Sequence, residues 1–275
     1  MKVTLFGTRG SVARAGIQTV KYGGDTSAVE VVGSDGTMLI IDAGTGLPRV
    51  EPHLEGGRID VLLSHLHFDH IQGLGFFRPM FDPDAEVHIW GPVSTTMVLE
   101  DRIARYLSPP LFPVRLRELQ ALHYHDVGLG TVYIGPFTIE TDLVCHPGPT
   151  IGLRVSENGN SFAYLSDHEP ALGSREFPES PEWTSGYELA KGVDWLIHDT
   201  QYTDDEYEER VGWVHSTIDH AIAFAEMVEA KRLVTFHHDP EHSDHELDHR
   251  LEEAQQRVNG DLEIIAGIDG LSFEV

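Results

Sequence analysis

The chain has 275 residues with 40% apolar content, and its 45 acidic against 19 basic side chains give a formal net charge of −26. This length and apolar content allow a substantial hydrophobic core, so we expect a single domain over residues 1–275. A surface this negative repels phosphate polymers, which disfavours long nucleic acid as a partner.

The sequence lacks a long apolar run, a signal-peptide pattern and a second cysteine, and these absences narrow the expected location and the candidate metal ligands. There is no apolar run of about 18 residues, and the strand-like residues 3–6 are not preceded by the pattern of a signal peptide. We therefore expect no membrane span and a cytoplasmic location. The single cysteine, Cys145, excludes an internal disulfide and a cysteine-rich zinc knuckle, which leaves histidines and carboxylates as the candidate metal ligands.

Strands dominate the predicted structure of the first third of the chain. Apolar and β-branched runs, separated by Gly, Asp and Ser, occupy residues 3–6, 28–32, 38–41 and 59–63. The last run leads directly into residues 64–70, which have the sequence SHLHFDH. Three histidines therefore lie on a loop at the C-terminal end of a strand, where catalytic groups often occur.

The rest of the chain mixes strands and helices. Residues 94–107 have apolar positions at helical spacing, which predicts a helix there. We also predict a hairpin turn at 157–160 and strands over 132–134, 137–144, 150–155 and 161–165. From residue 194 onward, the predicted elements alternate before closing strands: strand 194–198, helix 216–230, strand 232–236 and helix 243–258. Ser243 and Glu246 form a capping-box pattern for the last helix. This order predicts an α/β (α+β) fold of two sheets packed face to face and covered by helices.

Residues 65–70 supply four candidate metal ligands from one short loop: His65, His67, Asp69 and His70. Zinc binds neutral imidazole nitrogen and carboxylate oxygen in a compact shell. Alternation along an extended segment places His65 and His67 on one side. A turn of the chain at Asp69 then lets Asp69 and His70 face a second ion.

The motif His-x-His-x-Asp-His at residues 65–70 resembles the signature of the metallo-β-lactamase superfamily, and the resemblance covers essentially the whole chain. It implies a four-layer αβ/βα sandwich with two Zn²⁺ per chain at the sheet edge, and Mn²⁺ is the alternative metal. The implied ligands are His65, His67 and His146 for one ion, Asp69, His70 and His237 for the other, and Asp167 as the bridge. Because His238 follows His237, the identity of the last ligand stays open. Asp42 resembles the superfamily aspartate that orients a ligand.

Two further segments resemble the phosphodiesterase branch of the superfamily that includes ribonuclease Z. They are residues 198–200 (HDT) and 215–217 (HST). In that branch, the histidine in the position of His215 contacts the scissile phosphate and helps to protonate the leaving oxygen, held by a carboxylate in the position of Asp199. This chain has aspartate where ribonuclease Z usually has glutamate. The implied catalytic residues are Asp69, His215 and Asp199, in a reaction in which two zinc ions share and acidify a water.

The predicted substrate is a small anionic phosphodiester. The stretch between His146 and His198 is short and acidic, unlike the long basic, glycine-rich arm with which ribonuclease Z grips transfer RNA. Residues 7–11 (GTRGS) and 22–27 (YGGDTS) look more like bacterial and phage cyclic-nucleotide phosphodiesterases, including anti-Pycsar proteins. The resemblance implies hydrolysis of 3′,5′-cyclic nucleotides by a zinc-activated hydroxide, and a homodimer, which is common in this branch.

Three alternative functions remain open. A ribonuclease Z-like nuclease would need a basic track, against which the charge of −26 argues. A non-catalytic metal-binding sensory module would keep the ligands without turnover. A thioester or lactam hydrolase is disfavoured, because residues 146–150 (HPGPT) lack the second histidine of the glyoxalase-type pattern.

Overall fold

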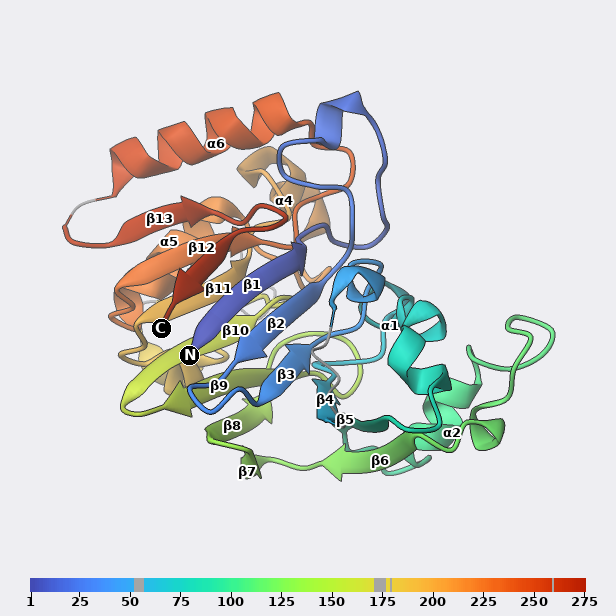
Figure 1. Ribbon diagram of the computed structural model, residues 1–275. Coiled ribbons are helices and arrows are strands. Elements are labelled where there is room, and N and C mark those ends of the chain that lie inside the picture. The colour runs from blue at the N-terminus through green and yellow to red at the C-terminus, as the bar shows by residue number, and fades with distance from the viewer. Residues whose placement is uncertain (52–56, 171–176, 179, 259) are drawn as a thin grey trace.

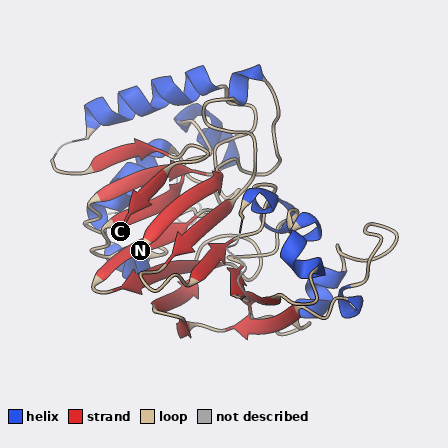
Figure 2. Cartoon of the chain, viewed as in Figure 1, coloured by secondary structure: helices blue, strands red, loops and turns tan. Residues whose placement is uncertain are grey.

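The computed structural model describes residues 1–51, 57–170, 177–178, 180–258 and 260–275. These residues form two sheets that face each other across a shared apolar core (Figure 1). Figure 2 shows the strands at the centre of the molecule and the helices on the outside. The expected four-layer αβ/βα sandwich is therefore confirmed. No helix within the described ranges is long and apolar enough to cross a membrane.

The first sheet joins the N-terminal part of the chain to its last strand. Its order is β14-β1-β2-β3-β4-β5-β6. The bounds are β1 Lys2–Gly7, β2 Ala28–Val32, β3 Met38–Ile41, β4 Arg58–Leu62, β5 Glu86–Pro92, β6 Leu122–Val127 and β14 Ser272–Glu274. Neighbours from β14 to β3 are antiparallel, and neighbours from β3 to β6 are parallel.

The second sheet has the order β13-β12-β11-β10-β9-β8-β7. The bounds are β7 Gly130–Ile134, β8 Phe137–Leu143, β9 Ile151–Glu157, β10 Asn160–Leu165, β11 Trp195–Asp199, β12 Arg232–Phe236 and β13 Glu263–Ala266. Neighbours from β7 to β10 are antiparallel, and neighbours from β10 to β13 are parallel. The predicted hairpin turn joins β9 to β10, where Asn158 and Gly159 have φ of 53° and 86°, as a two-residue hairpin loop requires.

Helices cover the outer face of each sheet. The α-helices are α1 Phe68–Ile71, α2 Leu99–Ala104, α3 Tyr187–Ala190, α4 Asp204–Arg210, α5 Ile218–Met227 and α6 Asp244–Arg257. The short 3-10 helices are η1 Ile17–Thr19, η2 Leu47–Arg49, η3 Leu74–Phe76, η4 Arg78–Phe81, η5 Leu116–Glu118 and η6 Pro181–Trp183. Helix α6 begins with the predicted capping box, in which Ser243 Oγ accepts from Glu246 N and the Glu246 carboxylate accepts from Ser243 N.

Three clusters of buried apolar side chains hold the layers together. One lies between the two sheets and includes Val29 and Phe162. A second packs the first sheet against its helices, through residues such as Ile40 and Ile103. The third packs the second sheet against α3, α5 and α6, with Phe224 at its centre. The central strands are therefore buried on both faces, which fits their apolar sequences.

Several elements differ from the sequence-based prediction. Helix α2 occupies only the middle of residues 94–107, because Ser and Thr at 94–96 are weak helix formers and Pro109 follows its end. Strands β5 and β6 and helix α4 were not predicted, and the β6 sequence LHYHDV lacks the expected apolar pattern. The predicted loop at 64–70 continues into α1, so Asp69 and His70 lie in the first turn of a helix.

Candidate metal centre

Each predicted metal ligand lies just beyond the C-terminal end of a strand. Residues 65–70 follow β4, His146 follows β8, Asp167 follows β10 and His237 follows β12. Strands β4, β10 and β12 each have a parallel neighbour. Because parallel strands deliver their carboxyl ends to the same edge of a sheet, ligands far apart in the sequence meet at one edge of the sandwich.

The seven predicted ligands form two groups that share one carboxylate. In each group, one donor atom from every residue lies within 4.8 Å of the others. The first group is His65, His67, His146 and Asp167, and the second is Asp69, His70, Asp167 and His237. All of these side chains are buried except His67. Asp167 belongs to both groups, so its carboxylate would be shared by two ions held there.

Buried atoms at the centre of these groups have no hydrogen-bond partner among the described residues. They are His65 Nε2, His70 Nε2 and Asp167 Oδ2. A buried polar atom without a partner is costly and calls for an explanation. Imidazole nitrogens and carboxylate oxygens that face one point are the donor set of zinc, so the residues present fit a divalent cation.

The opposite nitrogens of His65 and His70 are tied to one buried carboxylate, Asp42. His70 Nδ1 donates to Asp42 Oδ2 at 2.7 Å, and Tyr164 OH donates to the same oxygen at 2.7 Å. Ser64 Oγ donates its one hydrogen to Asp42 Oδ1 at 2.9 Å. The same Ser64 oxygen therefore accepts from His65 Nδ1, which is 3.0 Å away. Because Nδ1 of both rings is engaged in these hydrogen bonds, Nε2 is the nitrogen that remains to bind a metal.

Carbonyl oxygens orient two more imidazoles in the same way. His146 Nδ1 donates to Val214 O at 3.0 Å, and His237 Nδ1 donates to Gln201 Oε1 at 3.0 Å. Because a carbonyl oxygen only accepts, the proton is on Nδ1 in both rings. The remaining Nε2 atoms lie 3.6 Å and 3.2 Å from Asp167 Oδ1, respectively.

The two adjacent histidines that end β12 have different surroundings. His237 belongs to the second donor group, whereas His238 Nε2 donates to Gly267 O at 2.8 Å and the residue belongs to neither group. The ring of His237 lies against the backbone of Gly10. A Cβ at Gly10 would lie only 2.4 Å from His237 Nδ1, so a side chain there would displace the imidazole.

Backbone strain is concentrated around the donor groups. Ser11, Asp42, Val214 and His237 all have φ between 56° and 66°, a region that non-glycine residues rarely adopt. Ser11 N donates to Asp69 Oδ2 at 2.7 Å, and the other three either hold a predicted ligand or are one. Such conformations cost roughly 1–3 kcal/mol each and cluster at functional sites.

The protonation of the site differs between the two donor groups. Burial lowers the pKa of His146 to about 4 and holds the pKa of His65 well below its ordinary value, so both imidazoles are neutral near pH 7. Burial opposes charge on His70 as well, but the carboxylates of Asp167 and Asp69 outweigh it and raise its pKa. Burial is likewise outweighed at Asp69 and Asp167, whose pKa values are lowered by the neighbouring histidines. The second group therefore favours a positive charge at its centre.

His215 and Asp199 form a hydrogen-bonded pair beside the donor groups. His215 Nδ1 donates to Asp199 Oδ2 at 2.7 Å, so aspartate reaches the histidine in this chain. Asp199 is fully buried and also accepts from the backbone N–H groups of His168, Gln201 and Ser216. The His215 ring centre lies 5.0 Å from that of His237 and 5.1 Å from that of His146.

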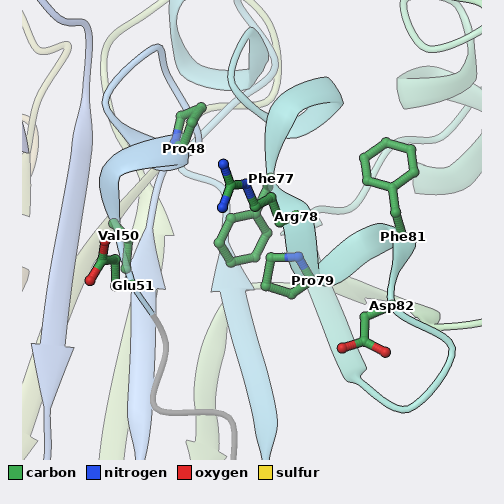
Figure 3. A pocket seen from close by; sticks show the side chains of 8 residues that line it. All are labelled: Pro48, Val50, Glu51, Phe77, Arg78, Pro79, Phe81 and Asp82. Carbon is green, nitrogen blue, oxygen red and sulfur yellow. The ribbon is translucent and has the colours of Figure 1, made fainter.

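A cavity of about 450 Å³ adjoins the donor groups and has His65 and His67 in its wall. Another cavity, of about 590 Å³, lies between η2 and η4 (Figure 3). Its lining contains none of the predicted site residues: Pro48, Val50, Glu51, Phe77, Arg78, Pro79, Phe81 and Asp82. Of these two cavities, the first is the one that adjoins the donor groups.

Sequence reasoning missed most of the residues that orient the ligands. Ser64 directly precedes the histidine motif, and Tyr164 belongs to an otherwise ordinary strand. Val214 contributes only its backbone carbonyl, which every residue has. Asp42 alone was signalled, by its resemblance to a superfamily position.

Comparison with known proteins agrees with this fold. A family model described as Beta-lactamase superfamily domain matches residues 37–238. Ribonuclease Z from Myxococcus xanthus (strain DK1622) is 27% identical over 278 residues, which cover 86% of this chain and 88% of that protein.

Solved structures extend the similarity to the whole chain. The metallo-β-lactamase fold protein YhfI from Bacillus subtilis matches with a TM-score of 0.71 and 20% identity, over 99% of both chains. The short form of human tRNase Z matches with a TM-score of 0.66 and 21% identity, over 100% of this chain and 99% of that chain. At these identities, the two structures establish a shared fold.

Proposed function

This chain belongs to the family of the Beta-lactamase superfamily domain, and we infer that it is a metal-dependent phosphodiesterase. We propose that its substrates are small anionic phosphodiesters, with 3′,5′-cyclic nucleotides favoured, and that it binds two Zn²⁺ per chain, with Mn²⁺ as the alternative. The observation that carries this proposal is the His215–Asp199 pair beside two groups of donors for divalent cations. It combines a positioned proton donor with a site for charge neutralisation.

Two kinds of residue serve the proposed metal site: the ligands, and the groups that orient the ligands by hydrogen bonds. The proposed ligands are His65, His67 and His146 for one ion, Asp69, His70 and His237 for the other, and Asp167 between them. Two Zn²⁺ held by these residues would supply the chemistry of acidifying a water and neutralising negative charge on phosphate oxygens. Asp42, Val214 and Gln201 accept hydrogen bonds from Nδ1 of His70, His146 and His237, respectively, so Nε2 of each ring faces the site.

His215 is the proposed proton donor to the leaving oxygen. Cleavage of a phosphodiester releases an alkoxide, a strong base that needs a proton. Because Nδ1 of His215 is bonded to Asp199, the proton that can be given lies on Nε2. The buried Asp199 carboxylate fixes the orientation of the ring through this hydrogen bond.

The charge of the protein supports a small substrate. A net charge of −26 repels a polymer of phosphates, whereas a single phosphodiester is attracted to cations held in the site. We also propose a homodimer, as the family resemblance implies. Light scattering should then give twice the mass of one chain, and a monomer at micromolar concentration would contradict it.

The test of the proposed function is hydrolysis of cAMP, cGMP, cCMP and cUMP by protein of measured zinc content. Bis-p-nitrophenyl phosphate and a short RNA serve as comparators. We expect efficient opening of at least one cyclic nucleotide and its loss on adding a chelator. Activity on the generic ester alone would keep the metal chemistry and contradict the cyclic-nucleotide substrate.

A nuclease is the second candidate, because one relative that matches most of this chain is a ribonuclease Z. The negative charge argues against it, since phosphate polymers are bound through basic surfaces. The same assay separates the two proposals. Chelator-sensitive cleavage of the short RNA without cleavage of cyclic nucleotides would favour the nuclease.

A further inference from the structure

The cavity beside the metal centre has a wall suited to a flat apolar group. Its volume is about 450 Å³, within the range of small-molecule sites. His65 and His67 form the end nearest the proposed ions. Apolar residues supply much of the remaining wall, among them Phe68, Ile71, Tyr106, Leu111, Pro147 and Pro149. A molecule whose phosphate lies at the metal centre would therefore place its next few atoms against apolar surface.

Phe68 is an unusual residue for its position. It stands between two proposed ligands, His67 and Asp69, and its side chain is 53% exposed. Its ring meets that of Tyr106 edge to face, with ring centres 4.9 Å apart and planes at 84°. Tyr106 is itself held by its hydroxyl, which donates to Gln72 O at 2.9 Å. The aromatic ring of Phe68 is thus supported at one side and still open to a ligand.

Two arginines line the same cavity, Arg102 and Arg105. Arg102 is held by Pro92 O and by Asp126, which lies 3.3 Å from its Nη2. The guanidinium of Arg105 has no hydrogen bond or ion pair within the described part of the chain, although acidic residues outnumber basic ones 45 to 19. Arg105 therefore offers hydrogen-bond donors to an acceptor that the protein itself does not supply.

We propose that this cavity binds the heteroaromatic base of a nucleotide substrate, with the base stacked on Phe68 and Arg105 donating to acceptor atoms on its edge. The proposal rests on the proposed function for the position of the phosphate. Stacking on an aromatic side chain tolerates any base, so Phe68 supplies affinity. Arg105 supplies selectivity, because paired guanidinium donors match the two acceptors O6 and N7 of guanine better than the mixed donor and acceptor edge of adenine.

Calorimetric binding of GMP, AMP and ribose 5-phosphate to the zinc-loaded protein tests the stacking role without requiring turnover. We expect GMP to bind at least about tenfold more tightly than ribose 5-phosphate, because only GMP carries a base. Phe68→Ala should weaken GMP about tenfold and leave ribose 5-phosphate nearly unchanged. Phe68→Leu, which keeps an apolar side chain between the ligands, should weaken GMP less, and zinc content is measured for both variants.

The matched control is Phe76→Ala, which removes a 65% exposed ring from the same region that is not part of the cavity wall. It should bind all three compounds like the unaltered protein. Equal binding of GMP and ribose 5-phosphate by the unaltered protein would overturn the proposal. Equal weakening of both compounds in Phe68→Ala would also overturn it, since that pattern reports damage to the phosphate site.

The selectivity role of Arg105 has its own test. Arg105→Ala should weaken GMP about tenfold more than AMP, whereas Arg117→Ala, at an exposed arginine outside the cavity, should change neither. Equal loss for GMP, AMP and ribose 5-phosphate would place Arg105 at the phosphate and overturn its assignment to the base.

Turnover measurements keep this proposal separate from the proposed function. If cyclic nucleotides are not hydrolysed but GMP binds in a Phe68-dependent manner, the proposed function fails and the base site stands. If cyclic nucleotides are hydrolysed with the same KM in Phe68→Ala as in the unaltered protein, the function stands and the base site fails.

Discussion

The candidate metal centre and a second histidine group, on strands β5 and β6, contain the same residue types but are bonded differently. We call the second the β5–β6 histidine group, and its members are Glu86, His88, His123 and His125. In the metal centre, His65 and His70 use Nδ1 for hydrogen bonds that lead away from the site and leave Nε2 without a partner. The Nε2 atoms of His65 and His70 lie 3.7 Å and 3.0 Å from oxygens of Asp167, respectively.

In the β5–β6 histidine group, the central residue His88 has both ring nitrogens in hydrogen bonds. Donor atoms of Glu86, His88 and His123 lie within 4.8 Å of one another, as in the metal centre. However, His88 Nε2 is bonded to Glu86 Oε1 at 2.8 Å, and its Nδ1 is bonded to His125 Nε2 at 2.7 Å. Trp90 stacks on His125 with ring centres 4.0 Å apart. Both nitrogens of His88 are therefore already used in tying the two strands together.

Nearness of histidines and carboxylates therefore does not by itself define a metal site. A site also needs ring nitrogens that face the ion while the opposite nitrogen of each ring is held by a hydrogen bond. By this criterion, we expect the candidate metal centre to bind metal, because His65 Nε2 and His70 Nε2 have no hydrogen-bond partner among the described residues, and we expect the β5–β6 histidine group not to.

The largest expected effect is loss of a ligand from the metal centre. His67→Ala or Asp69→Ala should remove bound zinc and reduce hydrolysis to background, because each takes a donor from one ion. The matched change, His88→Ala, should keep both zinc and activity. Elemental analysis and an activity assay on the same preparations check this. Equal zinc loss in His88→Ala would contradict the distinction between the metal centre and the β5–β6 histidine group.

Removal of the proposed proton donor should separate metal binding from catalysis. His215→Ala should retain zinc while kcat falls by about 10²–10⁴, since His215 protonates the leaving oxygen and is not one of the proposed ligands. Zinc analysis and kinetics on the purified variant make the measurement. Loss of both ions in this variant would contradict its role as a proton donor.

Removal of an orienting carboxylate should have a smaller effect on the metal. Asp42→Asn should weaken zinc binding by about 10–100-fold, because Asp42 holds both His65 and His70 in the metal-binding tautomer. The control is Asp60→Asn, a buried carboxylate that accepts from Trp90 Nε1 at 2.7 Å beside the β5–β6 histidine group. Competition with a chelator measures both, and equal weakening would show that Asp42 acts only through general stability.

The smallest effect concerns the pH dependence of the β5–β6 histidine group. The hydrogen bond from His88 lowers the pKa of Glu86 below its ordinary value of 4.5. The stabilising contribution of Glu86 is therefore present above that pH and is lost as the pH falls through the lowered pKa. Glu86→Gln should be slightly less stable than the unaltered protein at neutral pH, and the difference should vanish in acid.

Thermal unfolding at several pH values gives this difference, with Glu118→Gln as the control at an exposed glutamate on η5. A Glu86→Gln difference that stays constant from pH 7 to pH 3 would contradict the assigned role of the Glu86–His88 hydrogen bond.

Much of the fold was predictable because the central strands are buried on both faces and so have apolar sequences, as at residues 28–32 and 232–236. Strands β5 and β6 escaped prediction for the opposite reason. Their inward-facing positions near the sheet edge carry His88, Trp90 and His125, which interrupt the apolar pattern. Polar side chains that bond to one another in the fold cannot be recognised as strand signals in the sequence.

The residues of the candidate site could be predicted where they are consecutive in the sequence. Those that come together only in the folded chain could not. The types and spacing of residues 65–70 suffice to suggest zinc. The carbonyl that orients His146 comes from Val214, 68 residues away, and depends on an unusual φ at that residue. Gln201 similarly reaches His237 only because β11 and β12 are neighbours.

The most direct test of the central claim is anomalous diffraction at the zinc edge from crystals of the zinc-loaded protein. The hydrogen bonds of the metal centre and of the β5–β6 histidine group predict two anomalous peaks per chain, about 3.5–4 Å apart on either side of Asp167. No peak is expected at His88. A peak within the β5–β6 histidine group, or no peak beside Asp167, would contradict the rule that unpaired, converging ring nitrogens mark the metal site.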